Sequence, residues 1–177
     1  MRVAFLMAPA GVEQVELERP WQAVRGEGWE PRLVSTRPGT VQAFHHLDKG
    51  DTFPVDDVVE SSTAEDFDAL VLPGGLANPD FLRTDEKAVA FARHFFGLAR
   101  PVAAICHGPW TLVEADVVRG RTLTSWPSLA TDIRNAGGIW VDEKVQVCHA
   151  APGTLITSRK PDDLPAFCAA LVQEFRR

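Results

Sequence analysis

Short apolar runs alternate along this chain with longer stretches whose apolar residues have helical spacing. Clear runs of the first kind are Arg2 to Met7, Arg32 to Thr36, Ala69 to Leu72 and Pro101 to Ile105. Strands that are apolar on both faces are typical of parallel sheets, because helices cover both sides. The alternation therefore predicts a mostly parallel sheet between layers of helices, which is an α/β fold.

The remaining segments extend this pattern. A helix is expected after the first strand, with Pro20 either bending it or marking a late start. Glycine and proline punctuate residues 38–59, which favours a hairpin there. Further helices are predicted near 62–66, 84–99, 109–115, 128–136 and from 161 onward, and further strands near 121–125, 144–148 and 154–158. No repeat or linker interrupts the pattern, so residues 1–177 are expected to form one domain.

Charge and hydropathy narrow the possible partners. The chain has 24 acidic and 18 basic residues, which gives a net charge of −6. Nucleic-acid binding proteins need a cationic surface, so a nucleic-acid partner is not expected. No segment reaches the ~18 consecutive apolar residues of a membrane helix, so no membrane association is expected and a cytoplasmic protein is predicted.

The cysteines and histidines do not form a metal-binding pattern. Three cysteines, with no CxxC spacing, fit neither a disulfide framework nor a zinc site. His45 and His46 precede Asp48, but adjacent side chains on a strand point to opposite faces. A solvated hairpin is the preferred interpretation, and neither a metal nor another cofactor is predicted. Cys148 and Cys168 are interpreted as inert packing residues.

Cys106 is the strongest candidate for a nucleophile. It directly follows a predicted buried strand and precedes Gly108 and a predicted helix. This is the context of a nucleophile elbow, in which a sharp turn lifts one side chain above the end of the sheet. The N-terminus of the helix also favours the thiolate over the thiol.

A second strand is predicted to end beside the first, at Gly74 and Gly75. Paired glycines let backbone N–H groups approach a ligand closely. Together with the N–H group of His107, they are expected to bind a developing oxyanion.

Three further polar residues are candidates at the same edge. Glu13 follows the first strand, where its carboxyl group could exchange a proton with the thiol and position a substrate. Glu16 is interpreted as a residue that stabilises the start of the helix. His107 adjoins the nucleophile and needs another group to orient it, for which Asp80 is a candidate; a solvated loop position is the alternative for Asp80.

Seen together, these segments resemble the PfpI family of the class I glutamine amidotransferase-like superfamily. The motifs are Glu13-Gln-Val-Glu-Leu17, Phe67-Asp-Ala-Leu-Val-Leu-Pro-Gly-Gly75, Ala104-Ile-Cys-His-Gly-Pro109, Arg119-Gly-Arg121, Asn135-Ala-Gly137 and Thr157-Ser-Arg-Lys-Pro-Asp-Asp-Leu164. The resemblance implies a flavodoxin-like three-layer sandwich and a homodimer or higher oligomer. It also implies a nucleophile at Cys106, with Glu13 and His107 beside it and Asp80 reaching His107 from a neighbouring subunit.

Three functions remain open at this point. The leading hypothesis is a stress-response hydrolase in which Cys106 attacks a glyoxal-derived adduct or a reactive aldehyde, Glu13 carries the proton and His107 assists. The second is an intracellular cysteine peptidase, with Asp80 of a partner chain orienting His107. The third is a redox-sensing stress protein or a chaperone, in which the Cys106 thiolate is oxidised selectively.

Overall fold

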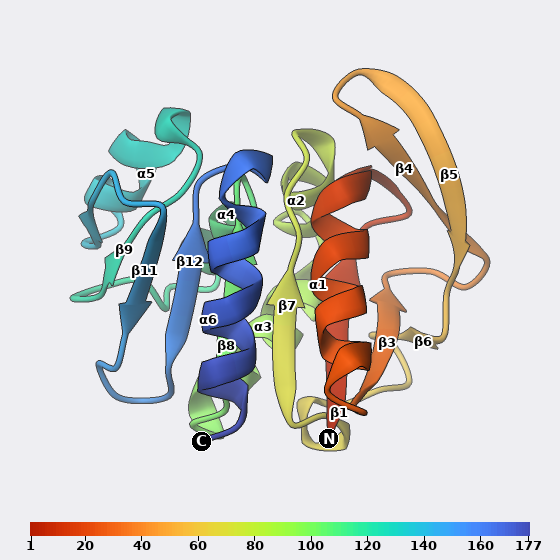
Figure 1. Ribbon diagram of the computed structural model, residues 1–177, viewed down its shortest axis with the longest axis horizontal. Coiled ribbons are helices and arrows are strands. Elements are labelled where there is room, and N and C mark those ends of the chain that lie inside the picture. The colour runs from red at the N-terminus through yellow and green to blue at the C-terminus, as the bar shows by residue number, and fades with distance from the viewer.

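Seven strands form the central sheet in the order β11-β12-β8-β7-β1-β3-β6 in the computed structural model, which describes residues 1–177 (Figure 1). The strands are β1 (Arg2–Met7), β3 (Glu30–Ser35), β6 (Asp57–Val58), β7 (Ala69–Leu72), β8 (Val102–Ile105), β11 (Val145–Cys148) and β12 (Leu155–Ser158). Each neighbouring pair is parallel except β11 and β12. The predicted mostly parallel sheet is therefore confirmed.

Helices cover both faces of this sheet (Figure 1). One face carries α1 (Gln14–Gly26) and α6 (Leu164–Phe175), and the other carries α2 (Ala77–Leu82), α3 (Glu86–Gly97), α4 (Pro109–Glu114) and α5 (Ala130–Asn135). Short 3-10 helices occupy Ala64–Asp66, Pro127–Leu129 and Pro161–Asp163. The structure is the three-layer α/β/α sandwich that the alternation predicts. None of the helices is both long enough and apolar enough to cross a bilayer.

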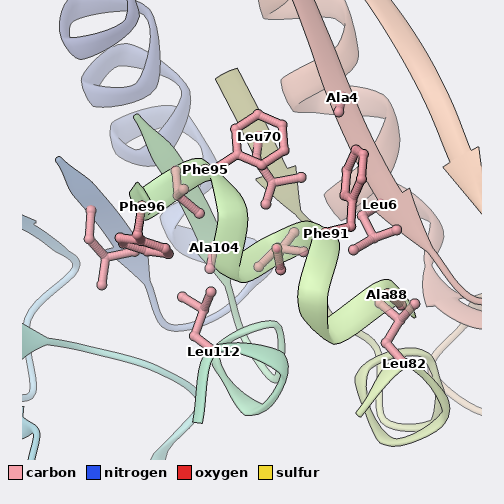
Figure 2. Packing of buried hydrophobic residues seen from close by; sticks show 14 of the residues in the cluster. Ala4, Leu6, Leu70, Leu82, Ala88, Phe91, Phe95, Phe96, Ala104 and Leu112 are labelled. Atoms are coloured by element: carbon pink, nitrogen blue, oxygen red, sulfur yellow. The ribbon is translucent and has the colours of Figure 1, made fainter. Parts of the chain in front are cut away.

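Alternate residues of each strand feed two separate hydrophobic clusters. In β1, Leu6 packs in the cluster under α3, whereas Phe5 packs in the cluster under α1 and α6. Figure 2 shows the first cluster, where Phe95 of α3 lies near Leu70 of β7. Because both faces of the central strands β7 and β8 are buried, these two strands contain no polar residues, and chemistry is left to the segments that follow them.

A hairpin stands beside the central sheet. It consists of β4 (Thr40–His45) and β5 (Asp48–Pro54), and β4 also pairs with the short strand β2 (Ala10–Glu13). Figure 1 shows β4 and β5 in orange, projecting beyond β3 at one side of the molecule. The hairpin predicted within residues 38–59 is therefore confirmed. A separate parallel pair joins β9 (Thr122–Leu123) to β10 (Ile139–Trp140).

Several local expectations change. Helix α1 begins at Gln14 and runs through Pro20, so the late start considered there does not occur. Three short elements, β2, β10 and α2, were not predicted from the sequence. Helix α2 forms around Pro79 because a proline in the first turn needs no intrahelical N–H bond. The side chain of Asn78 also accepts a hydrogen bond from the Ala8 N–H (2.8 Å) and donates to the Pro73 carbonyl (3.0 Å).

Candidate active site

The ends of three adjacent strands bring the predicted residues together. Strand β7 pairs with both β1 and β8, so the segments that follow these strands meet at one edge of the sheet. Cys106 follows β8, Gly74 and Gly75 follow β7, and Glu13 ends β2 after β1. This is the edge at which parallel α/β sheets bind ligands.

Cys106 lies in the sharp turn between β8 and α4. Its φ angle is +60°, a left-handed conformation that is unfavourable for a residue with a Cβ atom. Its N–H donates to the Ser158 carbonyl (3.0 Å), and its carbonyl accepts from the Trp126 N–H (2.9 Å). These two bonds hold the strained residue in place, with 6% of its surface exposed. The structure thus has a sharp turn between strand and helix at Cys106, as the sequence predicts, and the role of Cys106 as a nucleophile stays a prediction.

Burial controls the ionisation of Cys106. Burial raises the pKa of the Cys106 thiol, and a negative charge on Glu16 would raise it further. Hydrogen bonds from the backbone N–H groups of Gly75 and His107 lower the pKa, but burial outweighs them. The helix N-terminus alone predicts the opposite direction, but α4 has only six residues. The thiol therefore keeps its proton at neutral pH until a neighbouring group accepts it.

Glu16 is the carboxyl group that lies against Cys106, the candidate nucleophile. Its side chain is fully buried, and Oε2 accepts a hydrogen bond from the Gly74 N–H (2.8 Å) while Oε1 has no partner. Burial raises the pKa of Glu16 to about 8, against the lowering effect of the Gly74 hydrogen bond. Glu16 is therefore neutral at pH 7 and adds no charge opposing the thiolate. A neutral carboxyl group can also donate a proton, which a carboxylate cannot.

From the sequence, Glu16 was predicted only to stabilise the start of the helix. The available signal was its position three residues after Glu13, which places both glutamates at the start of α1, close to the edge of the sheet. That spacing could not show that one carboxyl group is buried against Cys106 while the other lies nearer the protein surface.

Glu13 lines the same cavity but has different partners. Its Oε2 accepts a hydrogen bond from the backbone N–H of His46 at the tip of the hairpin (2.9 Å). The His46 ring lies farther away, with Nδ1 at 3.8 Å from the same oxygen. The structure thus shows Glu13 in contact with the β4–β5 hairpin, and shows no hydrogen bond between Glu13 and Cys106.

His107 lies beside the sulfur, between two tryptophans. Its Nδ1 is 3.2 Å from the Cys106 Sγ. The imidazole ring stacks on Trp126 with centroids 5.7 Å apart and meets the edge of Trp110 at 5.4 Å. Burial lowers the pKa of His107, so the ring is neutral at pH 7 and can accept a proton.

The two glycines after β7 have different environments. The N–H group of Gly74 donates to Glu16, so it is already paired and is not free to bind an oxyanion as predicted. The N–H group of Gly75 instead points toward the sulfur, as that of His107 does. Gly75 has a φ angle of +83°, and a Cβ atom there would collide with the Gly11 carbonyl oxygen, so only glycine fits.

Asp80 does not meet His107 within one chain. It lies on the first turn of α2, rather than in the loop considered in the sequence analysis, and it is exposed to solvent. Its carboxylate makes no hydrogen bond within the chain, so the structure of one chain leaves the predicted contact with a neighbouring subunit as a prediction.

A small cavity of about 180 Å³ opens at Cys106. Glu13, Glu16 and His107 line its polar side, and Leu76 and Trp126 lie at its mouth. Four larger hollows, of about 300, 370, 420 and 800 Å³, lie elsewhere, but none of them is lined by a cysteine, so the smaller cavity is the candidate active site. The chain contains no cluster of three His, Cys, Asp or Glu side chains that could hold a metal ion.

Comparison with known proteins places this chain among relatives of the same length. The DJ-1/PfpI family model matches residues 1–174. Deglycase PH1704 of Pyrococcus horikoshii is 43% identical over 173 residues, covering 98% of each chain. Protein/nucleic acid deglycase 2 of Escherichia coli is 41% identical over 157 residues, covering 88% of this chain and 87% of the relative.

The fold is also found in solved structures. A two-domain protein of Anabaena variabilis with DJ-1/ThiJ/PfpI-like and ferritin-like domains superposes with a TM-score of 0.88 and 32% identity. The match covers 97% of this chain and 47% of the Anabaena chain. With the family model spanning nearly every residue, the resemblance seen in the motifs is confirmed: the chain belongs to the DJ-1/PfpI family.

Proposed function

We propose that this protein is a stress-related cysteine-dependent hydrolase of the deglycase or glyoxalase type, acting on glyoxal-derived adducts or on reactive aldehydes. One observation carries the proposal: a strained cysteine lies against a buried glutamate that is neutral at pH 7. Such a pair offers both a nucleophile and a proton donor to a small carbonyl compound. Relatives named deglycases support the same class.

The chemistry can be assigned to the residues that line the cavity. As the Cys106 sulfur bonds to the aldehyde carbon, Nδ1 of His107 takes the thiol proton. The carbonyl electron pair moves to oxygen, where Glu16 supplies a proton and the N–H group of Gly75 stabilises the charge. With methylglyoxal, the hydrogen of the aldehyde carbon then moves as a proton to the neighbouring ketone carbon, which leaves a thioester on Cys106. Water hydrolyses the thioester, which breaks the carbon–sulfur bond, restores the thiol and releases lactate. No external oxidant is needed, because the aldehyde carbon is oxidised while the neighbouring ketone carbon is reduced.

Purified protein incubated with methylglyoxal tests this proposal. Lactate formation is expected, with a loss of at least about 100-fold in kcat in Cys106→Ala. Cys148→Ala is the matched control and should retain turnover, because Cys148 lies outside the cavity. Full turnover by Cys106→Ala, or none by the wild type, would refute the proposal.

The other two functions have distinct tests in the same preparations. Cleavage of a fluorogenic peptide, lost in Cys106→Ala, would favour the peptidase. Mass spectrometry after mild peroxide tests the redox function, which requires oxidation of Cys106 ahead of Cys148 and Cys168. The small cavity favours a small carbonyl substrate over a peptide.

We also propose that the protein acts as a homo-oligomer in which a partner copy supplies Asp80 to His107. The exposed position of Asp80 supports this, since no group of its own chain pairs with it. Phe81, next to it on α2, is 53% exposed, as expected for a residue that a second copy would cover.

A further inference from the structure

The exposed apolar side chains of this protein are concentrated at the cavity. Six large apolar residues are exposed in the whole chain, and three of them line this one opening: Leu47, Leu76 and Trp126. Their exposed fractions are 84%, 58% and 38%. Leu47 comes from the hairpin tip, Leu76 from the segment before α2, and Trp126 from the segment after β9. Three distant parts of the chain thus form one apolar rim around the cavity mouth.

The hairpin tip that carries Leu47 is held in place at two points. Glu13 accepts the N–H of His46, whose φ angle of +59° is unfavourable for a residue with a side chain. Gln14 exchanges two hydrogen bonds with Asp51 of β5, one through each atom of its amide group (2.7 and 2.8 Å). The last residue of β2 and the first residue of α1 therefore fix the position of Leu47 relative to the cavity.

The size and charge of the cavity limit what it can bind. No lysine or arginine lines it, and its ionisable groups are two glutamates, two histidines and the Cys106 thiol. An anionic substrate would therefore lack a fixed positive partner and would meet Glu13. A volume of about 180 Å³ is enough for one small ring, since an apolar cavity of roughly 150 Å³ can bind benzene.

We infer that the β4–β5 hairpin tip is a specificity element that selects uncharged 2-oxoaldehydes with an apolar substituent. Leu47 contacts that substituent together with Leu76 and Trp126. Glu13 is a positioning residue that acts through His46. The inference rests on the proposed function and names the substrate class for the same site.

Rates with glyoxal and phenylglyoxal test the inference, because the two compounds differ only in the apolar group. The wild type should have the higher kcat/KM for phenylglyoxal. The substrate ratio is defined as kcat/KM for phenylglyoxal divided by kcat/KM for glyoxal. Leu47→Ser should reduce this ratio by roughly 3- to 10-fold, the scale of losing part of an apolar contact. Ile139→Ser is the matched control and should keep the ratio, because Ile139 is 55% exposed but lies away from the cavity.

Two substitutions at Glu13 separate positioning from proton transfer. Glu13→Gln keeps an oxygen that can accept the His46 N–H, so the substrate ratio should remain near that of the wild type. Glu13→Ala removes the acceptor, and the ratio should fall as in Leu47→Ser, mainly through KM for phenylglyoxal. Equal loss of kcat in both Glu13 variants would overturn the positioning role.

A binding measurement keeps this inference separate from the proposed function. Acetophenone carries the phenyl ring but no aldehyde, and its binding can be followed by NMR through the indole signal of Trp126. Binding that weakens in Leu47→Ser but not in Ile139→Ser would support the apolar rim even if no aldehyde is turned over. If Leu47→Ser leaves both the substrate ratio and acetophenone binding unchanged, the inference is wrong. The inference is also wrong if the only effect of Leu47→Ser is a change in oligomeric state.

Discussion

The buried carboxyl group of Glu16 makes a prediction about stability and pH. Its pKa rises from 4.5 in the unfolded chain to about 8 in the folded protein, because burial disfavours the charged form. Below pH 4.5 both states are protonated, and Glu16 has no effect on the pH dependence. Above it the unfolded state loses the proton first, so the folded protein loses stability as pH rises toward 8.

The size of the effect follows from that shift. Each unit of pKa difference corresponds to about 1.36 kcal/mol. Between pH 5 and pH 8 the contribution of Glu16 to the free energy of unfolding should therefore fall by about 3 to 4 kcal/mol. In Glu16→Gln this fall should disappear, because glutamine does not titrate and can still accept the Gly74 N–H bond.

Urea denaturation of the wild type and of Glu16→Gln at pH 5, 6, 7 and 8 measures the difference directly. Subtracting the two curves removes the contributions of all other groups. Glu143→Gln, at an exposed position, is the control and should run parallel to the wild type. If Glu16→Gln also runs parallel to the wild type over this range, Glu16 is ionised in the folded protein, and its role as a proton donor is wrong.

Three further substitutions test the arrangement around the nucleophile. Gly74→Ala should abolish turnover and lower the free energy of unfolding by about 1 to 3 kcal/mol. The new Cβ atom would lie 2.5 Å from Glu16 Oε2 and 2.7 Å from the Cys106 Cβ, and activity assays and thermal denaturation measure the two effects. Asn78→Ala should lower the free energy of unfolding by about 2 to 4 kcal/mol, because it leaves one backbone N–H group and two backbone carbonyl groups without their side-chain partner. A loss below about 0.5 kcal/mol, measured by urea denaturation, would contradict this. Asp80→Ala should reduce turnover without changing the stability of one chain, and mixing it with inactive Cys106→Ala should restore activity if the acid acts between subunits.

The candidate site could be predicted only in part. Local sequence was sufficient for Cys106, because a buried strand, a small-residue turn and a helix follow one another directly. Gly75 could be placed at the same edge of the sheet, because it follows a second predicted buried strand. For the two glutamates, sequence suggested proximity to the edge of the sheet but not which one is buried. That choice depends on Gly74, which is 58 residues away from Glu16 and donates to it.

Local sequence also misled where tertiary contacts compete with it. Residues 76–82 resemble a loop, but the hydrogen bonds of Asn78 to Ala8 and Pro73 stabilise a helical turn there. The thiol of Cys106 was expected to ionise readily because of its helix, yet burial acts more strongly and in the opposite direction.

The order of strands and helices was determined by the sequence itself, because hydrophobic periodicity is a local property that every segment carries on its own. The same is true of the sharp turn that carries Cys106 between β8 and α4. Only the tertiary structure decided which carboxyl group lies against the sulfur, that Glu13 supports the hairpin, and that three distant apolar residues surround one cavity. These features depend on how far each group is buried and on its neighbours in space, and both are set only when the strand ends and the hairpin come together.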